Sequence, residues 1–236
     1  FSSSGLDIAG AIEDNLCYKA YELLRADHKV PPVHIHLHKI IPMGAGLGGG
    51  SSDGECFLMG LNRLWDLNLS QSELMSLGLE LGADVPFFLF GKNAFVEGIG
   101  EQLSYLDLPE EQFLVIFPGR SIATKDVFQA ETLTRDHAPI TIFEFLAGSW
   151  KDPPFGNDLQ SVASKICPEV NQALDWIAQQ APNSVNRMTG SGSSVFAAIP
   201  KSFSAHKIDQ MLQKLPSGWV GRLVQGLKQN PAYNSV

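Results

Sequence analysis

Two stretches in the first part of the chain repeat apolar residues at the spacing of an α-helix. Residues 16–24 carry apolar side chains on one face, and Asp14, just before them, is the expected N-cap. Residues 56–65 are apolar on nearly all sides, which indicates a deeply buried helix whose N-terminus lies at Ser51 or Ser52. Both helices should therefore contribute to a core.

A third helix and an aromatic strand should follow. Ser70 and Glu73 have the spacing of a capping box, and the helix that they open should end at Gly82. The apolar run at 85–90 predicts a strand, with Asp84 directly before it. We therefore expect the Asp84 carboxylate at the partly buried end of a strand.

Residues 33–38 alternate apolar side chains with histidines, which is the period of a strand with one buried face. His34, His36 and His38 should then share the other face. Three imidazoles on one face could bind a metal, but no nearby Cys, Asp or Glu completes a ligand set. Solvent-facing polar positions on a half-buried strand are the commoner explanation.

The second half of the chain mixes strands and helices without a strict strand–helix–strand rhythm. We expect a buried strand at 113–117 and helices that begin near Thr141 and Pro168. The last expected elements are a strand at 195–199, a helix at 203–215 and a strand at 219–224. An acidic, Pro-containing connection precedes residue 113, so we divide the chain into domains 1–109 and 110–236 of the α+β class.

Composition and charge narrow the functional classes. The 236 residues are 44% hydrophobic and 18% charged, which is ordinary for a globular protein. Acidic residues outnumber basic ones, 25 to 17, and the net charge of −8 should repel nucleic acid and anionic membranes. Three cysteines lack C-x-x-C spacing and no apolar run could span a bilayer, so we expect a cytoplasmic protein without a nucleic-acid, membrane or obligatory protein partner.

The chain therefore needs a local site for any anionic ligand, and residues 43–53 offer one. Five of the seven residues from 44 to 50 are glycine, and they lead into a helix N-terminus, where unpaired N–H groups favour phosphate. The loop lacks the Gly-Lys-Ser/Thr ending of a P-loop. It also lacks the acidic residue that a dinucleotide-binding motif requires about twenty positions on. A tight turn without a ligand would not require so many glycines.

Asp84 and a second glycine turn, at 188–194, are the other candidate features. A lone Asp in such a place is most often an N-cap or turn residue, and a lone glycine-serine turn can be a simple hairpin. Near a phosphate site, however, an Asp can accept or orient the proton of an attacking hydroxyl group.

These features together resemble a known family. The blocks that carry the resemblance are 42–53, 82–88 and 189–192, with further agreement at 13–16, 98–101, 118–119 and 157–159. They resemble the conserved blocks of the GHMP kinases, and the match runs from about residue 12 to the end of the chain. Within that superfamily, three glycines followed by two serines are similar to the branch that phosphorylates 4-diphosphocytidyl-2-C-methyl-D-erythritol.

The resemblance implies a two-domain α+β fold, with a ribosomal-protein-S5-like N-terminal domain and a ferredoxin-like C-terminal domain. It implies ATP and Mg²⁺ as cofactors and a small-molecule substrate, cytidine diphosphate-methylerythritol, in the methylerythritol phosphate route to isoprenoids. The 2-hydroxyl of that substrate would attack the γ-phosphate of ATP. Asp84 would be the catalytic residue that takes or orients its proton.

The resemblance also implies binding residues. Those expected around ATP are Pro42, Met43, Gly44, Ala45, Gly46, Leu47, Gly48, Gly49, Gly50, Ser51, Ser52, Lys39, Asn15 and Leu16. Lys39 would supply the cation that the loop lacks, and Ser52 is the candidate Mg²⁺ ligand. Those expected around the substrate are Thr124, Phe128, Gly190, Ser191 and Gly192. Phe128 would stack on the cytosine ring, or would otherwise be an ordinary helix core residue.

The sequence departs from the family in two places. Family members usually begin with a strand and loop that carry a catalytic Lys, an Asn and a Gly-Tyr-His stretch, and none of these precedes Phe1. If the chain given is the whole molecule, we expect one strand of the N-terminal domain to be absent and phosphotransfer to be severely impaired. Residues 54–56 also replace the small residues that commonly open the buried helix, so we expect Glu55 to face solvent or a cation.

Three alternatives stay open at this stage. The chain could be another GHMP kinase, of the homoserine or mevalonate type, which a panel of hydroxyl acceptors would distinguish. It could be a catalytically inactive relative that binds a nucleotide, which would show ATP binding without phosphotransfer. A more distant alternative is an NAD-dependent oxidoreductase, which would enhance the fluorescence of NADH.

Overall fold

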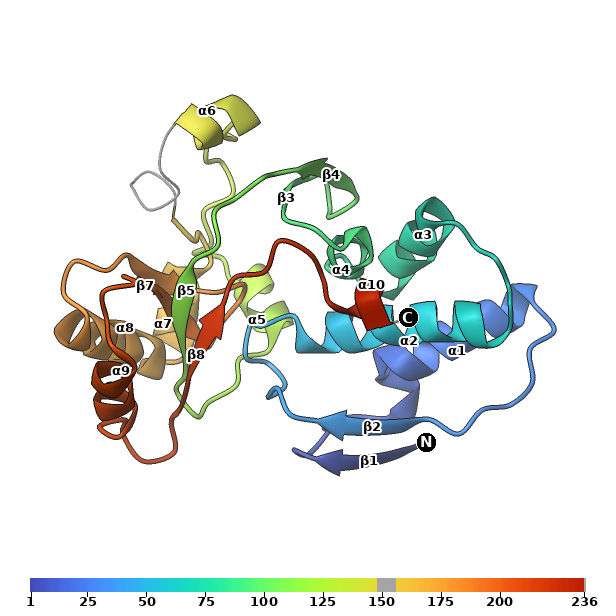
Figure 1. Cartoon of the computed structure of the whole chain (residues 1–236), viewed down its shortest axis with the longest axis horizontal. Helices are drawn as coiled ribbons and strands as arrows, with labels where there is room; N and C mark the ends of the chain where they lie inside the picture. The colour runs from blue at the N-terminus through green and yellow to red at the C-terminus, as the bar shows by residue number, and fades with distance from the viewer. Residues whose placement is uncertain (148–155, 236) are drawn as a thin grey trace. The chain divides into compact units, whose positions relative to one another are not determined.

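A computed structural model describes residues 1–147 and 156–235 (Figure 1). The chain divides into two compact units. The first unit comprises residues 1–43, 48–109 and 227–236, and the second comprises residues 44–47 and 110–226. A single division after residue 109 would place two short segments in the other unit: residues 44–47 of the glycine loop, which belong to the second unit, and residues 227–236, which belong to the first.

The first unit is built around four helices, α1 (Leu16–Asp27), α2 (Gly49–Leu64), α3 (Gln71–Leu81) and α4 (Val85–Phe90). Two short helices, η1 (Ile12–Asp14) and α10 (Ala232–Ser235), complete its helical part. The buried apolar residues that hold the four helices together are Ala20, Leu24, Leu58, Met59, Leu61, Leu74, Leu81, Val85 and Leu89. Removal of these side chains from water supplies the main stabilisation of this unit.

The starts of the first three helices test the expected caps. The N-cap of α1 is Asn15, whose Oδ1 accepts a hydrogen bond from the Cys17 amide at 2.9 Å, so the assignment of Asp14 is wrong. Helix α2 begins at Gly49, earlier than expected, because Gly48 as N-cap turns the chain into the helix with φ +65°. The capping box of α3, between Ser70 and Glu73, is confirmed.

The expected aromatic strand at 85–90 is helix α4, so that prediction is wrong. Val85, Pro86 and Leu89 are its buried residues, and a continuous apolar run hides such helical spacing from the sequence. Pro86 suits the first turn of a helix, where its missing N–H is not needed. Asp84 is consequently at the N-terminus of a helix.

The strands of the first unit form two ribbons. In the first, β1 (Ser2–Gly5) pairs in parallel with β2 (His36–Lys39), and in the second, β3 (Ala94–Glu97) pairs antiparallel with β4 (Gln102–Tyr105). The three histidines are all exposed, and the hydroxyls of Ser2 and Ser4 hydrogen-bond to their rings at 2.8–3.0 Å. Among the described residues, no group of three His, Cys, Asp or Glu side chains could hold a metal. The histidines are therefore polar positions on an exposed strand face.

The second unit contains one antiparallel sheet with the strand order β6-β7-β5-β8. The strands are β5 (Gln112–Phe117), β6 (Asn186–Met188), β7 (Val195–Ile199) and β8 (Val220–Gln225). The helices are α5 (Thr124–Gln129), α6 (Ile142–Ala147), α7 (Gln160–Ile166), α8 (Glu169–Gln180) and α9 (Ala205–Leu212). The strand and helix starts expected at 113, Thr141, Pro168 and 195 are confirmed to within a residue or two, and α9 is shorter than expected.

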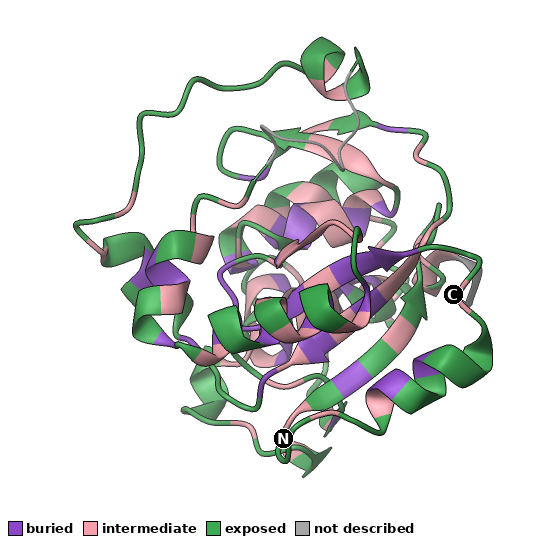
Figure 2. Ribbon diagram, turned by 90° about the vertical axis from the view of Figure 1, so that its left-hand side faces the viewer, coloured by how far each residue is buried: buried purple, intermediate pink, exposed green. Residues whose placement is uncertain are grey.

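The core of the second unit lies between this sheet and helices α7, α8 and α9 (Figure 2). Leu114 and Ile116 of β5 are buried, and so are Val195 and Ala197 of β7. These residues alternate along their strands as expected for a sheet that buries one face.

Among the described residues, no helix is long and apolar enough to cross a membrane.

The expectation that Glu55 faces solvent or a cation is wrong. Its side chain is fully buried on α2, where Asn230 donates a hydrogen bond to Oε1 at 3.3 Å and the Cys56 thiol donates to Oε2 at 3.1 Å. Tyr233, from the same C-terminal segment as Asn230, donates a hydrogen bond to the carbonyl of Leu89. Burial raises the pKa of the Glu55 carboxyl, and these two hydrogen bonds oppose the rise.

Replacement of Glu55 by Gln should raise the melting temperature at pH 7, because the amide retains an acceptor oxygen and carries no buried charge. Folding raises the pKa of this carboxyl, so the native protein loses stability as the pH rises above 4.5, where the unfolded carboxyl ionises. The gain from E55Q should thus be largest at neutral pH and vanish below about pH 4. Thermal unfolding across this pH range measures it.

A control for this prediction is Glu73→Gln. Hydrogen bonds from the side chain and amide of Ser70 lower the pKa of the Glu73 carboxyl, so its contribution to stability is lost as the pH falls. E73Q should therefore lower the melting temperature at pH 7. If E55Q does the same, burial of the Glu55 charge is not costly and the prediction is wrong.

Candidate functional site

The first half of the glycine loop, residues 44–47, is held by hydrogen bonds within the second unit. Gly44 accepts a hydrogen bond from the Ile122 amide at 3.0 Å, and Ala45 accepts one from the Ser194 amide at 3.0 Å. The Thr189 hydroxyl donates to the carbonyl of Gly46, also at 3.0 Å. The glycine turn at 189–194 therefore supports this half of the loop directly.

Gly46 is where the two glycine segments pack most closely. Its φ is +68°, and a Cβ atom placed on it would overlap the carbonyl oxygen of Thr189 and lie 2.8 Å from the nitrogen of Gly192. Any larger residue would meet rigid backbone atoms as well as an unfavourable conformation. The glycine at position 46 thus serves packing against the turn, which the sequence alone did not indicate.

The second half of the loop is the N-terminus of α2 in the first unit. The first hydrogen bond of this helix runs from the Ser52 amide to the Gly48 carbonyl at 2.9 Å. The amides of Gly49, Gly50 and Ser51 precede this bond, so their N–H groups have no partner within the helix. A Cβ atom placed on Gly50 would meet no protein atom within 4 Å, which leaves open space at the helix end.

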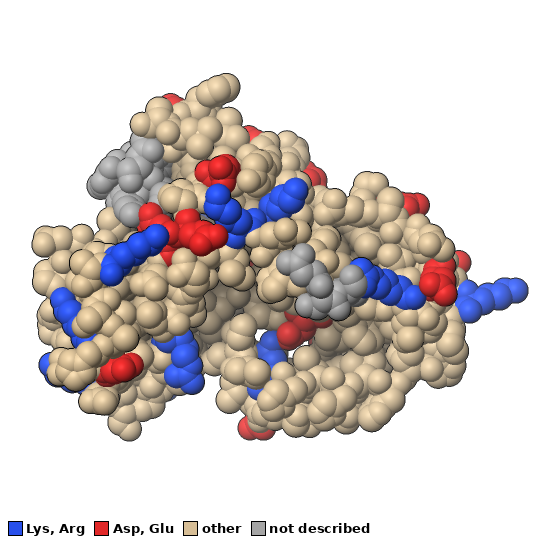
Figure 3. Space-filling view, in the orientation of Figure 1, with Lys and Arg blue, Asp and Glu red and all other residues tan. Residues whose placement is uncertain are grey.

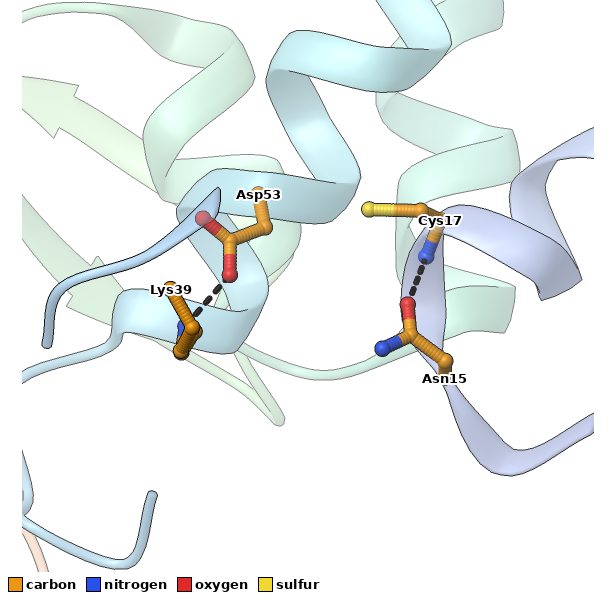
Figure 4. Close-up of polar contacts among 4 residues, drawn as sticks. All are labelled: Asn15, Cys17, Lys39 and Asp53. Atoms are coloured by element: carbon orange, nitrogen blue, oxygen red, sulfur yellow. Dashed lines mark hydrogen bonds and ion pairs between the residues drawn. The ribbon is translucent and has the colours of Figure 1, made fainter. Parts of the chain in front are cut away.

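Lys39 lies beside this helix end, as expected, but it is already paired. Its side chain is 6% exposed, and its ammonium group donates a hydrogen bond to Asp53 Oδ2 (Figure 4). A Cβ atom placed on Gly49 would lie 3.4 Å from Lys39 Nζ, which locates the ammonium at the first turn of α2. Sequence reasoning gave Asp53 no role, although a buried lysine at a strand end requires an acidic partner.

Asn15 and Leu16 lie at the start of α1. Figure 4 shows the Asn15 side chain turned toward the Cys17 amide that it caps. A Cβ atom placed on Gly54 would lie 3.1 Å from Leu16 Cβ, so α1 and α2 pack closely here. Burial and the neighbouring Asp53 raise the pKa of the Cys17 thiol to about 11, which keeps it protonated at neutral pH.

Asp84 is exposed at the N-cap position of α4, and not partly buried as expected. No hydrogen bond or ion pair joins its carboxylate to another described residue. The turn that contains Gly100 fixes the preceding backbone, because a Cβ atom placed on Gly100 would overlap the carbonyl oxygen of Ala83. Further along α4, the Phe88 ring packs against Gly48 of the loop. The same short helix therefore positions Asp84 and contacts the start of α2.

The residues expected around the substrate lie in the second unit. The Thr124 hydroxyl, on α5, hydrogen-bonds to that of Ser191 at 2.8 Å, so α5 and the glycine turn are joined. Phe128 lies one helical turn after Thr124 and is 53% exposed, which excludes a role as a core residue. Gly190 and Gly192 flank Ser191 in the turn, and the structure thus brings the turn and α5 together.

The remaining expected residues, Pro42, Met43 and Ser52, lie before the loop and at its end. Pro42 is half-buried and Met43 is exposed immediately before it. Ser52 lines a cavity of about 300 Å³ in the first unit, together with Phe87, Phe88 and Asn230. On the face shown in Figure 3, lysines and arginines lie among acidic side chains. At the loop itself, the first turn of α2 offers an anion its backbone amides and the ammonium group of Lys39, which is already paired with Asp53.

Comparisons with known proteins agree with this arrangement. The family model described as the GHMP kinases N terminal domain matches residues 15–92, and the GHMP kinases C terminal model matches residues 136–218. Two relatives bear the name 4-diphosphocytidyl-2-C-methyl-D-erythritol kinase. That of Polynucleobacter asymbioticus is 55% identical over 95% of this chain and 76% of its own length. That of Polynucleobacter necessarius is 58% identical over 86% of this chain and 68% of its own length.

A solved structure agrees as well. The crystal structure of a 4-(cytidine 5'-diphospho)-2C-methyl-D-erythritol kinase superposes with a TM-score of 0.71 at 32% identity, and the match covers 95% of this chain and 84% of that one. With both domain models matched in order and relatives more than half identical, the chain belongs to the GHMP kinases, in the family of the 4-diphosphocytidyl-2-C-methyl-D-erythritol kinases.

Proposed function

We propose that this chain transfers the γ-phosphoryl group of ATP to the 2-hydroxyl of 4-diphosphocytidyl-2-C-methyl-D-erythritol, a step of isoprenoid biosynthesis. The observation that carries the proposal is the glycine loop, which runs into a helix end with open space beside Gly50 and with three amides that have no hydrogen-bond partner within the helix. Relatives that bear the name of this kinase support the choice of substrate. The three free cysteines, of which Cys56 is exposed, agree with a reducing cytoplasm.

The loop binds the ATP phosphates through its backbone. Amides of Gly49, Gly50 and Ser51 point out of α2, and the partial positive charge of the helix N-terminus adds to their attraction for phosphate. Lys39 adds a full positive charge at this turn, but Asp53 offsets part of it. We assign Asn15 and Leu16, at the start of α1, to the nucleotide-binding residues as well.

Mg²⁺ supplies charge neutralisation for the phosphates when it is bound. The donor set at the first turn of α2 fits this ion in part, since Ser51 and Ser52 offer hydroxyl oxygens and Asp53 offers a carboxylate. Mg²⁺ commonly takes few protein ligands and completes its shell with phosphate oxygens and water. We assign Ser52 as the protein ligand.

Asp84 accepts or orients the proton of the substrate hydroxyl. Its exposed carboxylate has no partner among the described residues, so it remains available to a hydroxyl group. Its position is fixed by the backbone contact of Gly100 with Ala83 and by helix α4. A carboxylate on a rigid helix start can orient an attacking group without a large reorganisation.

Two alternatives are less well supported. Homoserine and mevalonate kinases share the fold, but a homoserine kinase structure is only 18% identical to this chain, which is evidence for the fold alone. A nucleotide-binding protein without activity would bind ATP and transfer no phosphate. Assay of the full-length gene product against a panel of hydroxyl acceptors distinguishes these alternatives, and turnover of homoserine or mevalonate in preference to the cytidylyl substrate would refute our proposal.

Replacement of Gly50 by Ala should weaken ATP binding about tenfold or more and leave stability almost unchanged. The added methyl group meets no protein atom, so it can interfere only with a ligand at the helix end. Isothermal titration with a non-hydrolysable ATP analogue measures the effect. Gly60→Ala, an equally open position on α2, is the matched control and should leave affinity unchanged while stabilising the helix by about 0.5–1 kcal/mol. Equal affinities for G50A and the native protein would place the phosphates elsewhere.

Replacement of Asp84 by Asn should lower kcat by roughly 10²–10⁴-fold while ATP affinity stays nearly the same, because the amide cannot accept the proton. Steady-state kinetics of the full-length gene product gives the comparison. Asp107→Asn is the control: it removes an exposed carboxylate that forms an ion pair with Lys228, and it should keep kcat within about twofold. Full turnover by D84N would remove Asp84 from the mechanism.

Replacement of Phe128 by Ala should raise the KM for the cytidylyl substrate, since stacking on a base contributes about 1–3 kcal/mol. That corresponds to an increase of roughly 5- to 150-fold, with little change in the KM for ATP. Phe143→Ala, at another exposed phenylalanine of the second unit, is the control and should change neither constant. An unchanged substrate KM for F128A would exclude the stacking role.

A further inference from the structure

We propose that Asn157 is a positioning residue for phosphotransfer, which holds the glycine turn at 189–194 in the shape that supports the phosphate loop. This inference rests on the proposed function for its effect on ATP. Its structural part concerns contacts within the second unit and can be tested without a nucleotide.

The Asn157 side chain uses both ends of its amide. Nδ2 donates hydrogen bonds to the carbonyl oxygens of Met188, at 3.0 Å, and of Gly190, at 2.8 Å. Oδ1 accepts a hydrogen bond from the Leu159 amide at 3.0 Å. A group that donates twice and accepts once with this geometry must be an amide, because a carboxylate has no hydrogens to donate at neutral pH.

The position of Asn157 explains how it can act as a clamp. It lies just before α7, where the carbonyl of Asn157 also accepts a hydrogen bond from the Gln160 amide at 2.9 Å. The Gln160 side chain in turn accepts a hydrogen bond from the Met188 amide at 2.8 Å. Side chains at the start of α7 therefore hydrogen-bond to both the amide and the carbonyl of Met188. Asn157 also hydrogen-bonds to the carbonyl of Gly190, inside the turn.

The turn transmits this constraint to the loop because the two are in backbone contact. The Thr189 hydroxyl and the Ser194 amide both bond to loop carbonyls, and Gly46 has no space for even a methyl group beside the turn. A shift of the turn by a few tenths of an ångström must therefore move the loop or break these bonds. Among the described residues, the hydrogen bonds of Asn157 reach the turn and the start of α7 but not residues 44–50, so its effect on the loop passes through the turn.

The chain contains a matched control in the first unit. Asn62 donates from Nδ2 to the Leu69 carbonyl at 3.1 Å and accepts at Oδ1 from the Leu69 amide at 3.0 Å. It thus clamps a connection by the same chemistry, between α2 and α3, without a bond to the glycine loop or the turn. The experiment compares Asn157→Asp with Asn62→Asp, because Asp keeps the shape and the acceptor but loses both donors.

In the full-length gene product, N157D should raise the KM for ATP at least tenfold with kcat within about threefold of native, and N62D should leave both constants within twofold. Without nucleotide, amide hydrogen exchange in peptides that cover 44–50 and 188–194 should be faster in N157D and unchanged in N62D. Native exchange rates in N157D would overturn the positioning role. If exchange is faster in N157D but the native protein binds no ATP, the proposed function is refuted, whereas the role of Asn157 in holding the turn is retained.

Equal changes in both variants would also overturn the inference, because they would reflect general destabilisation. Thermal unfolding of N157D and N62D checks that the two lose similar stability. If N157D does not fold, Asn157→Ala provides a second variant, since it removes the clamp without placing a carboxylate against two carbonyl oxygens. It should show the same increase in KM and the same local increase in exchange.

Discussion

The backbone contact between Gly46 and the glycine turn at 189–194 is the constraint on which the rest of the candidate site depends. A phosphate loop made of glycine has little preferred shape of its own, because glycine loses more conformational freedom on folding than any other residue. Here that freedom is removed by hydrogen bonds to Gly44, Ala45 and Gly46 from the second unit. The flexible sequence becomes a fixed cradle only through partners more than seventy residues away.

The positive charge at the loop is also fixed by contacts with other residues. The chain carries a net charge of −8, and the buried Lys39 at the loop forms an ion pair with Asp53. Under the proposed function, fixed backbone dipoles at the start of α2 would therefore carry much of the attraction for phosphate, and such dipoles need no counter-ion and no reorganisation when a ligand binds. The buried acid of α2, Glu55, is kept apart from this site by its bonds to Asn230 and Cys56.

Much of this arrangement could be predicted from local patterns. The capping box at Ser70, the glycine-rich entry to α2 and the apolar strand at 195–199 depend on neighbours in sequence, which the pattern contains. The helix at 85–90 was missed because a run of apolar residues has no visible period.

Other features depend on residues distant in sequence. Asn230, one of the two partners of Glu55, lies 175 positions away, and the partner of Lys39 lies 14 positions away on another element. No pattern around Glu55 signals that Asn230 will bury it. The role of Asn157 is likewise visible only once its bonds to Met188 and Gly190 are known.

The placement of the last segment has a consequence for biosynthesis. Residues 227–236 belong to the first unit, where Asn230 and Tyr233 bond to α2 and α4, yet they follow the whole of the second unit in the chain. A ribosome therefore delivers this piece of the first unit only after residues 110–226 have emerged. Until then the Glu55 carboxyl lacks the hydrogen bond from Asn230, so the first unit cannot complete its fold before the second unit has been synthesised.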